Sequence, residues 1–156
     1  MLSLIMALPL CVSAFKKIKL MKKALTYKGA VMTWECDSNG HMNVMYYVNK
    51  FEHANRNTNV ELGMTDLVGK NNIGIVVVEQ QIKYLREVFE DDLLYVESTL
   101  LDIGNKAFTI LHEMYNTKSK ELVSTMKVVL VLFDQIGRKA LPFPKDKKIA
   151  LGFIEQ

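Results

Sequence analysis

The sequence predicts an α+β domain in which an antiparallel sheet wraps around one long helix. The first observation is a stripe of side chains that recurs every three or four positions over residues 44–62, which is typical of one face of a helix. The second is a series of β-branched segments after that helix, separated by short polar breaks typical of turns. One helix followed by a run of strands is an element order of α+β domains.

The segments around the helix have recognisable boundaries. Residues 27–36 are predicted to form a strand that ends at Asp37, and residues 37–43 form a loop rich in Asp, Ser, Asn and Gly. Gly63 provides the expected stop after the helix. The helical stripe consists of Tyr47, Phe51, Ala54, Thr58 and Leu62.

The second half of the chain is predicted to be mainly strand. The strands are expected at residues 73–88, 93–103, 106–115 and 121–134. Because the breaks between them are short and polar, we expect these four strands to form an antiparallel meander joined by hairpin turns. The tail from Pro142 onward is expected to lie on the surface or to form a short terminal helix.

The first of these strands is apolar on both of its predicted faces. One face carries Val76, Val78, Ile82 and Tyr84, and the other carries Ile75 and Val77. A single helix cannot cover both faces, so we expect a second copy of the chain to bury the remainder, in a homodimer or homotetramer.

Composition narrows the class of protein. The chain has 156 residues, of which 49% are hydrophobic and 24% charged, which fits one globular domain over residues 24–156. The net charge of +3 comes from dispersed lysines, so no nucleic-acid partner is expected. The two cysteines and three histidines lack the spacing of a metal site, so no metal is expected.

Residues 1–23 are predicted to be an N-terminal extension or leader. The apolar run over residues 1–15 is followed, not preceded, by lysines, which argues against a signal peptide. The run is also short of the roughly 20 apolar residues that a membrane span needs. We therefore expect no membrane span and a cytoplasmic location, with a signal peptide and a membrane anchor as the lower-ranked alternatives.

Asp37 is the strongest candidate for a functional residue. It ends the first predicted strand and stands beside the start of the helix, where unpaired backbone N–H groups and the helix dipole stabilise negative charge. A carboxylate next to an anion-stabilising helix end provides most of what hydrolysis of an activated acyl group requires.

The residues around Asp37 form a recognisable motif. It consists of Asp37, Gly40, His41 and Asn43, followed by Tyr47, Phe51 and Glu52 on the helix. This pattern resembles the hotdog-fold acyl-CoA thioesterases of the 4-hydroxybenzoyl-CoA thioesterase group, and the similarity extends from about Val31 to Pro144. The resemblance implies a hotdog fold and hydrolysis of an acyl-CoA thioester to a free acid and coenzyme A.

The resemblance also implies roles for individual residues. Asp37 is the implied catalytic carboxylate, either as a general base for water or as a nucleophile that forms a mixed anhydride, and both routes stay open. His41 and Asn43 are expected to shape its loop or position water, and backbone amides near Asn43, Val44 and Met45 to bind the thioester carbonyl. Further substrate contacts are expected from Gly40, Tyr47, Trp34, Glu79 and Arg86.

Structural roles are the alternatives for several of these residues. Asp37 could instead cap the helix or its turn, and His41 could be a hydrogen-bonded loop histidine. Glu79 interrupts an apolar run, so it either faces the substrate or occupies a surface position at a sheet edge.

A closer similarity is to the thioesterases of carnitine breakdown, which act on betainyl-CoA or dehydrocarnitinyl-CoA. The shared runs are residues 37–44 and 84–88. This similarity implies a short acyl group that ends in a trimethylammonium, for which aromatic rings are the expected partners. The candidate rings are Trp34, Tyr46, Tyr47 and Phe51. Coenzyme A enters as part of the substrate, so no separate cofactor is expected, and acyl carrier protein stays open as the donor.

Two other function classes compete with this interpretation. Hotdog-fold hydratases and dehydratases place a histidine after an Asp-x-Asn motif, but here the interval from Asp37 to His41 is one residue short and lacks the usual proline. A non-catalytic acyl-CoA-binding protein is the other alternative, and the presence of Asp37 argues against it.

Overall fold

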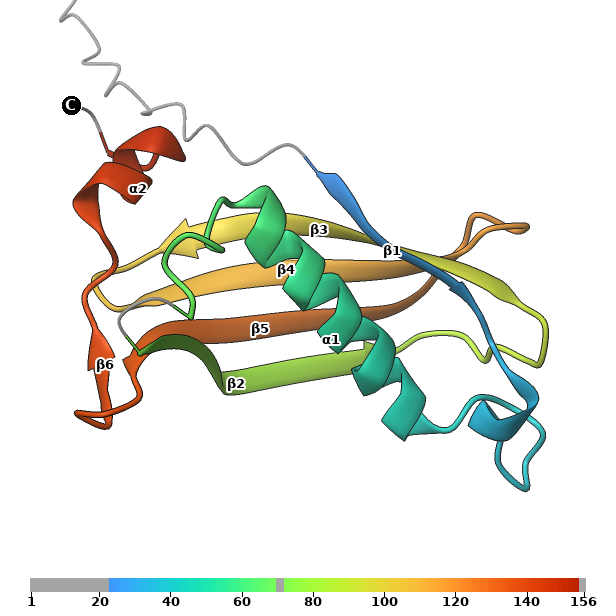
Figure 1. The fold of residues 1–156 in the computed structure, drawn as a ribbon. Helices are drawn as coiled ribbons and strands as arrows, with labels where there is room; N and C mark the ends of the chain where they lie inside the picture. Colours follow the sequence, from blue (N-terminus) through green and yellow to red (C-terminus); the bar gives the residue numbers. More distant parts are fainter. Residues whose placement is uncertain (1–22, 70–71, 155–156) are drawn as a thin grey trace, which may run out of the picture.

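A computed structural model of the chain describes residues 23–69 and 72–154 (Figure 1). The strands are β1 (Ala24–Ala30), β2 (Ile73–Tyr84), β3 (Leu93–Ile103), β4 (Ala107–Asn116), β5 (Leu122–Asp134) and β6 (Lys139–Leu141). The helices are α1 (Val44–Glu61) and α2 (Lys145–Ala150), and a short 3₁₀ turn, η1 (Thr33–Glu35), precedes α1. The sheet is antiparallel in the order β1-β3-β4-β5-β2, with β6 added to β5. The predicted α+β fold is confirmed.

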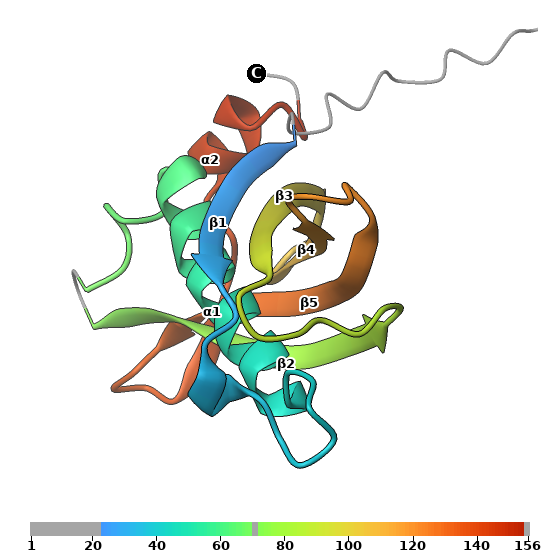
Figure 2. The same ribbon diagram turned by 90° about the vertical axis from the view of Figure 1, so that its right-hand side faces the viewer.

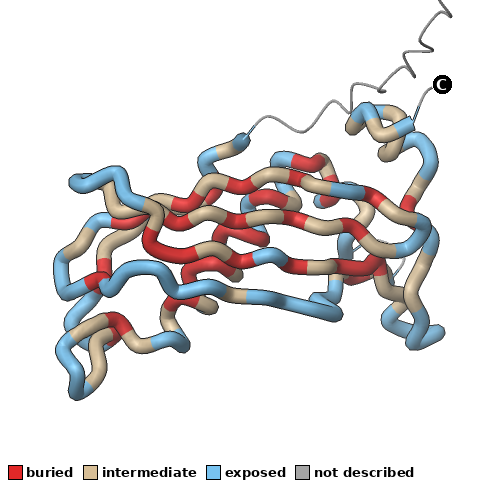
Figure 3. Tube along the Cα trace, turned by 180° about the vertical axis from the view of Figure 1, so that it is seen from behind, coloured by how far each residue is buried: buried red, intermediate tan, exposed pale blue. Residues whose placement is uncertain are grey.

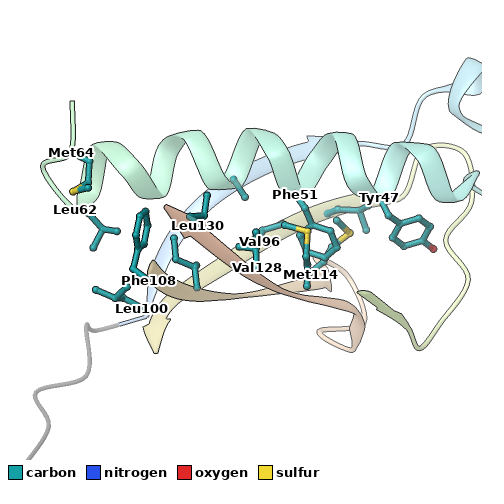
Figure 4. Close-up of a cluster of buried hydrophobic side chains, with 14 of the residues drawn as sticks. Tyr47, Phe51, Leu62, Met64, Val96, Leu100, Phe108, Met114, Val128 and Leu130 are labelled. Atoms are coloured by element: carbon teal, nitrogen blue, oxygen red, sulfur yellow. The ribbon is translucent and has the colours of Figure 1, made fainter. Parts of the chain in front are cut away.

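Helix α1 lies along the inner face of the curved sheet, where it packs against β1, β3 and β4 (Figure 1). Its predicted stripe is buried, and Figure 4 shows Tyr47 and Phe51 among the side chains that fill the space between helix and sheet. The helix ends before Gly63, whose φ of 62° is the left-handed conformation that glycine adopts without strain. The predicted helix boundaries are therefore confirmed within one residue.

Burial alternates along the central strands. Every second residue is buried along β4 and along β3 as far as Leu100, whereas β2 is exposed along most of its length (Figure 3). This period of two is the signature of a sheet with one covered face.

The predicted meander is wrong for its first strand. β3, β4 and β5 follow one another as expected, but β2 pairs with β5 and β1 pairs with β3, so β2 and β3 occupy different parts of the sheet. The connection between them crosses the start of α1 rather than turning tightly (Figure 2). Val88 in this connection is fully buried, and its carbonyl accepts a hydrogen bond from the Met42 N–H at 2.9 Å. These interactions favour the crossing over a hairpin.

Two predicted strands are too long. β1 ends at Ala30 rather than at residue 36, because the Glu35 side chain accepts the Met32 N–H at 3.0 Å and closes the η1 turn. β2 ends at Tyr84 rather than at residue 88, because the chain then leaves the sheet to cross α1.

A β-bulge changes the faces predicted for β2. Val77 lies opposite Leu130 and Glu79 lies opposite Val129, so Val78 is an extra residue in the strand. Residues before and after the bulge therefore exchange faces, and Val76 does not share a face with Ile82 as its spacing suggested.

The C-terminal tail forms the short helix that was one of its two expected states. Phe143, just before α2, is buried against Phe108 with ring centroids 5.4 Å apart. Within the described residues, none of the helices has the length and apolar character to cross a membrane. The extension predicted over residues 1–23 lies, apart from Lys23, outside the described residues.

Candidate active site

The Asp37 loop, residues 36–43, is a tight turn held at both ends. Cys36 and Met42 form a β-bridge, and the Asp37 N–H donates to the His41 carbonyl at 3.0 Å. Inside the turn, the Gly40 N–H donates to the Asp37 carbonyl at 2.9 Å, and Gly40 has a φ of 81°. This left-handed conformation suits glycine and accounts for its place in the motif.

The Asp37 carboxylate is held by two hydrogen bonds. Its Oδ1 accepts the Asn39 N–H at 2.9 Å, and its Oδ2 accepts the Asn43 side-chain amide at 3.1 Å. The bond from Asn39 is the main reason why the pKa of the Asp37 carboxyl lies below its usual value, and Asn43 and the His41 ring lower it further. The carboxylate is therefore ionised at neutral pH.

Asn43 links the loop to the helix. Its side-chain oxygen accepts the Met45 N–H at 3.0 Å and so caps α1, while its amide holds Asp37. Asn43, not Asp37, is thus the helix cap, and its side chain joins the Asp37 loop to α1.

The Val44 amide is the candidate binding site for an oxyanion. Of the three amides proposed from the sequence, the Asn43 N–H donates to the Glu35 carbonyl at 2.9 Å and the Met45 N–H is engaged by the cap. The Val44 N–H has no hydrogen-bond partner among the residues that the structure describes. An unpaired N–H in the first turn of a helix is well placed to stabilise developing negative charge.

A cleft of about 230 Å³ lies at the start of α1, next to the Asp37 loop, although Asp37 itself is not one of its lining residues. One wall comes from the loop and the first turn of the helix, and the other from the end of β2 and the segment that follows it. The lining residues are His41, Met42, Val44, Tyr47, Tyr84, Leu85, Arg86 and Glu87. The structure thus brings together four residues predicted from the sequence, namely His41, Val44, Tyr47 and Arg86.

Tyr47 joins the two walls. Its hydroxyl donates to the Arg86 carbonyl at 3.3 Å, and its ring meets Tyr84 edge to face at 5.1 Å. Burial, with smaller contributions from Tyr84 and Glu87, raises the pKa of Tyr47 to about 12. Tyr47 is therefore a neutral hydrogen-bond donor and an aromatic wall rather than an acid or base at neutral pH.

His41 stands between two carboxylates. Its Nδ1 lies 4.0 Å from Asp37 Oδ1, and its Nε2 lies 4.0 Å from Glu87 Oε1. These separations exceed hydrogen-bond distance, so His41 shapes the field around Asp37 without holding it directly.

Several predicted contacts lie elsewhere. Trp34 on η1 is 67% exposed and does not line the cleft, and Glu79 is exposed on the edge strand β2. Tyr84, Leu85 and Glu87 were not singled out as site residues, although their neighbour Arg86 was.

The chain matches the family model of the thioesterase-like superfamily over residues 31–151, and it belongs to that superfamily. The matched span includes the Asp37 loop, α1 and the whole sheet except β1. No curated protein matches the chain significantly.

Solved structures share the fold. The probable thioesterase YbaW from Escherichia coli is 21% identical with a TM-score of 0.74, over 85% of this chain and 100% of that one. A mutant of 4-hydroxybenzoyl-CoA thioesterase complexed with 4-hydroxybenzoyl-CoA is 20% identical with a TM-score of 0.74, over 85% of this chain and 99% of that one. A Staphylococcus aureus protein in complex with CoA is 22% identical with a TM-score of 0.73, over 84% of this chain and 83% of that one. At these identities the similarity establishes the hotdog fold.

Proposed function

We propose that this protein is an acyl-CoA thioesterase that hydrolyses a thioester to a carboxylic acid and free coenzyme A. The observation that carries the proposal is that Asn43 ties an ionised Asp37 to the start of α1, where the Val44 N–H has no hydrogen-bond partner among the described residues. Membership of the thioesterase-like superfamily supports it, as do similar structures named as thioesterases.

Two routes use this arrangement. In the first, Asp37 removes a proton from water while the water oxygen attacks the thioester carbonyl, and coenzyme A leaves as a thiol after protonation. In the second, Asp37 attacks the carbonyl, coenzyme A leaves, and water hydrolyses the resulting mixed anhydride. In both routes the carbonyl oxygen gains negative charge, which the Val44 N–H and the helix dipole stabilise.

For the acyl group we propose a short, betainyl-type chain. The sequence similarity to the carnitine-breakdown thioesterases supports it, and the Tyr47 and Tyr84 rings offer aromatic faces in the cleft to a trimethylammonium. Phe51 is fully buried in the core and Trp34 is not a lining residue, so these two candidates are set aside.

We further propose that the working form is a homo-oligomer, at least a dimer. Val76, Val77 and Val78 are 40%, 39% and 57% exposed on the edge strand β2, which is the kind of edge that another strand covers. The cleft in one chain is also smaller than the roughly 300–1,000 Å³ of typical ligand pockets. A cytoplasmic location stays a prediction.

The decisive experiment measures release of coenzyme A thiol from betainyl-CoA and from short and long acyl-CoA, with acyl carrier protein thioesters as a further set. The Asp37→Asn variant should lower kcat by roughly 10²- to 10⁴-fold, because the base or nucleophile is lost. The fold should persist, since asparagine keeps an acceptor for the Asn39 N–H.

Asp66→Asn is the matched control, because Asp66 is exposed in the turn after α1 and should leave kcat unchanged. Undiminished thiol release by Asp37→Asn would remove Asp37 from the mechanism. Water addition to an enoyl-CoA without thiol release would replace the thioesterase by the hydratase alternative.

A further inference from the structure

Outside the cleft, the described residues hold a buried ion pair that the chemistry above does not use. Lys50 of α1 is 2% exposed and Glu35 of η1 is 7% exposed, and Lys50 Nζ lies 2.6 Å from Glu35 Oε2. Lys50 also donates to the Ala30 carbonyl at 3.1 Å, so it ties the end of β1 and the η1 turn to the middle of the helix.

A buried pair of this kind is a poor device for stability alone. Removing two charges from water costs about as much free energy as their attraction returns, and well-packed apolar residues often serve the fold equally well. The position of the pair in the chain therefore needs another explanation.

Glu35 connects directly to the Asp37 loop. Its side chain accepts both Lys50 and the Met32 N–H, and its own carbonyl accepts the Asn43 N–H at 2.9 Å. Asn43 in turn caps α1 and donates to Asp37 Oδ2. A continuous set of hydrogen bonds thus runs from Lys50 through Glu35 and Asn43 to the Asp37 carboxylate.

We infer that Lys50 and Glu35 are positioning residues that hold the Asp37 carboxylate in register with the start of α1. This inference rests on the proposed function for its kinetic consequence. Its physical basis is that a misplacement of about 1 Å in a reacting group lowers turnover by roughly 10²-fold.

The test replaces both members of the pair, so that no charge is left buried alone. In the Lys50→Met/Glu35→Leu variant, kcat should fall by roughly 10- to 100-fold while KM stays within about twofold, because Asp37 is displaced but the wall formed by residues 84–87 and the first turn of α1 remain. The matched control is Lys23→Met/Glu113→Leu, which removes an ion pair of 2.9 Å at the opposite end of β1. The control should keep wild-type kcat.

A second readout does not depend on turnover. The pKa of the Asp37 carboxyl, followed by NMR, should rise in the Lys50→Met/Glu35→Leu variant, because the hydrogen bonds from Asn39 and Asn43 weaken. The other charged groups at the cleft, His41, Arg86 and Glu87, are unchanged in this variant. A raised pKa with no thioesterase activity in the wild type would overturn the proposed function but support the positioning role.

Glu35→Gln provides the conservative variant. Glutamine keeps an acceptor for the Met32 N–H and for Lys50, so kcat should stay within about threefold of wild type if hydrogen bonding positions the loop. Wild-type kcat and an unchanged Asp37 pKa in the folded double variant would overturn the inference.

Discussion

The Asp37 loop and the edge strand β2 differ in how far their groups find partners within one chain. In the loop, main-chain and side-chain groups pair with one another, and within the described residues the Val44 N–H that follows the Asn43 cap has no partner. On β2, three consecutive valines are exposed along an edge that no described strand covers. The difference teaches that the chemical groups are organised within one chain, whereas the surface around β2 is suited to a second copy.

The Val44→Pro variant tests the loop side of this comparison and should have the largest effect, which is on kcat. Proline has no N–H, yet it is favoured at the first position of a helix, and Asn43 already has the extended conformation that precedes proline. The variant should keep its stability and lose roughly 10²- to 10³-fold in kcat, as for removal of one oxyanion donor. Thiol-release kinetics and thermal unfolding measure the two effects.

Val44→Ala is the control, because it shortens the same side chain but keeps the N–H, and it should leave kcat close to wild type. Equal turnover by the proline and wild-type enzymes would show that another donor binds the carbonyl oxygen.

The second prediction concerns β2. The Val76→Lys/Val78→Lys variant places two charges on the exposed edge, which should prevent a second copy from pairing there. We expect a monomer by analytical ultracentrifugation and a fall in kcat/KM of about 10-fold or more, if the second copy completes the cleft.

Ile136→Lys is the matched control, since Ile136 is 74% exposed in the turn between β5 and β6 rather than on β2 itself. A wild-type protein that is already monomeric and fully active would contradict the proposed role of β2.

The smallest expected effect is on stability at mildly acidic pH. It should come from a buried histidine in the core and not from the Asp37 loop. His112 is fully buried on β4, its Nδ1 lies 2.6 Å from the Ser98 hydroxyl, and burial lowers its pKa to about 3. The unfolded chain, with a histidine pKa near 6.5, then binds more protons than the folded one below that pH. The contribution of His112 to the free energy of unfolding should therefore be fully present above about pH 6.5. Below that pH, the free energy of unfolding should fall by up to roughly 1.4 kcal/mol per pH unit.

Denaturant unfolding at several pH values measures this slope. The His112→Leu variant should reduce the slope, because the buried imidazole is removed. The variant should still fold, because Ser98 keeps Thr26 as a hydrogen-bond partner. Asp37 stays ionised over the same range, since its pKa lies below the ordinary value of 3.8. An equal slope in the variant would assign the effect to other groups.

Local sequence patterns predicted the parts of the site that depend on neighbouring residues. The Asp37 loop, its link to Asn43 and the extent of α1 all follow from turn residues, a capping residue and a helical stripe. These features are local, so a short stretch of sequence contains the information that produces them.

Predictions failed where distant segments meet. The meander was wrong because Val88 and the Met42 N–H draw the connection after β2 across α1. The faces of β2 were wrong because a bulge at Val78 is defined by its pairing with β5, not by its own composition. The local sequence predicted no role for Lys50, because its partner Glu35 comes beside it only in the fold.

The sequence by itself thus determined the α+β class, the long helix and the carboxylate at its start, because propensity, capping and periodicity act over a few residues. Only the tertiary structure decided the strand order, the free Val44 N–H and the second wall of the cleft. The hydrogen bond that joins the walls connects residues 39 positions apart. No local pattern specifies such a contact, since it forms only when the whole sheet closes around the helix.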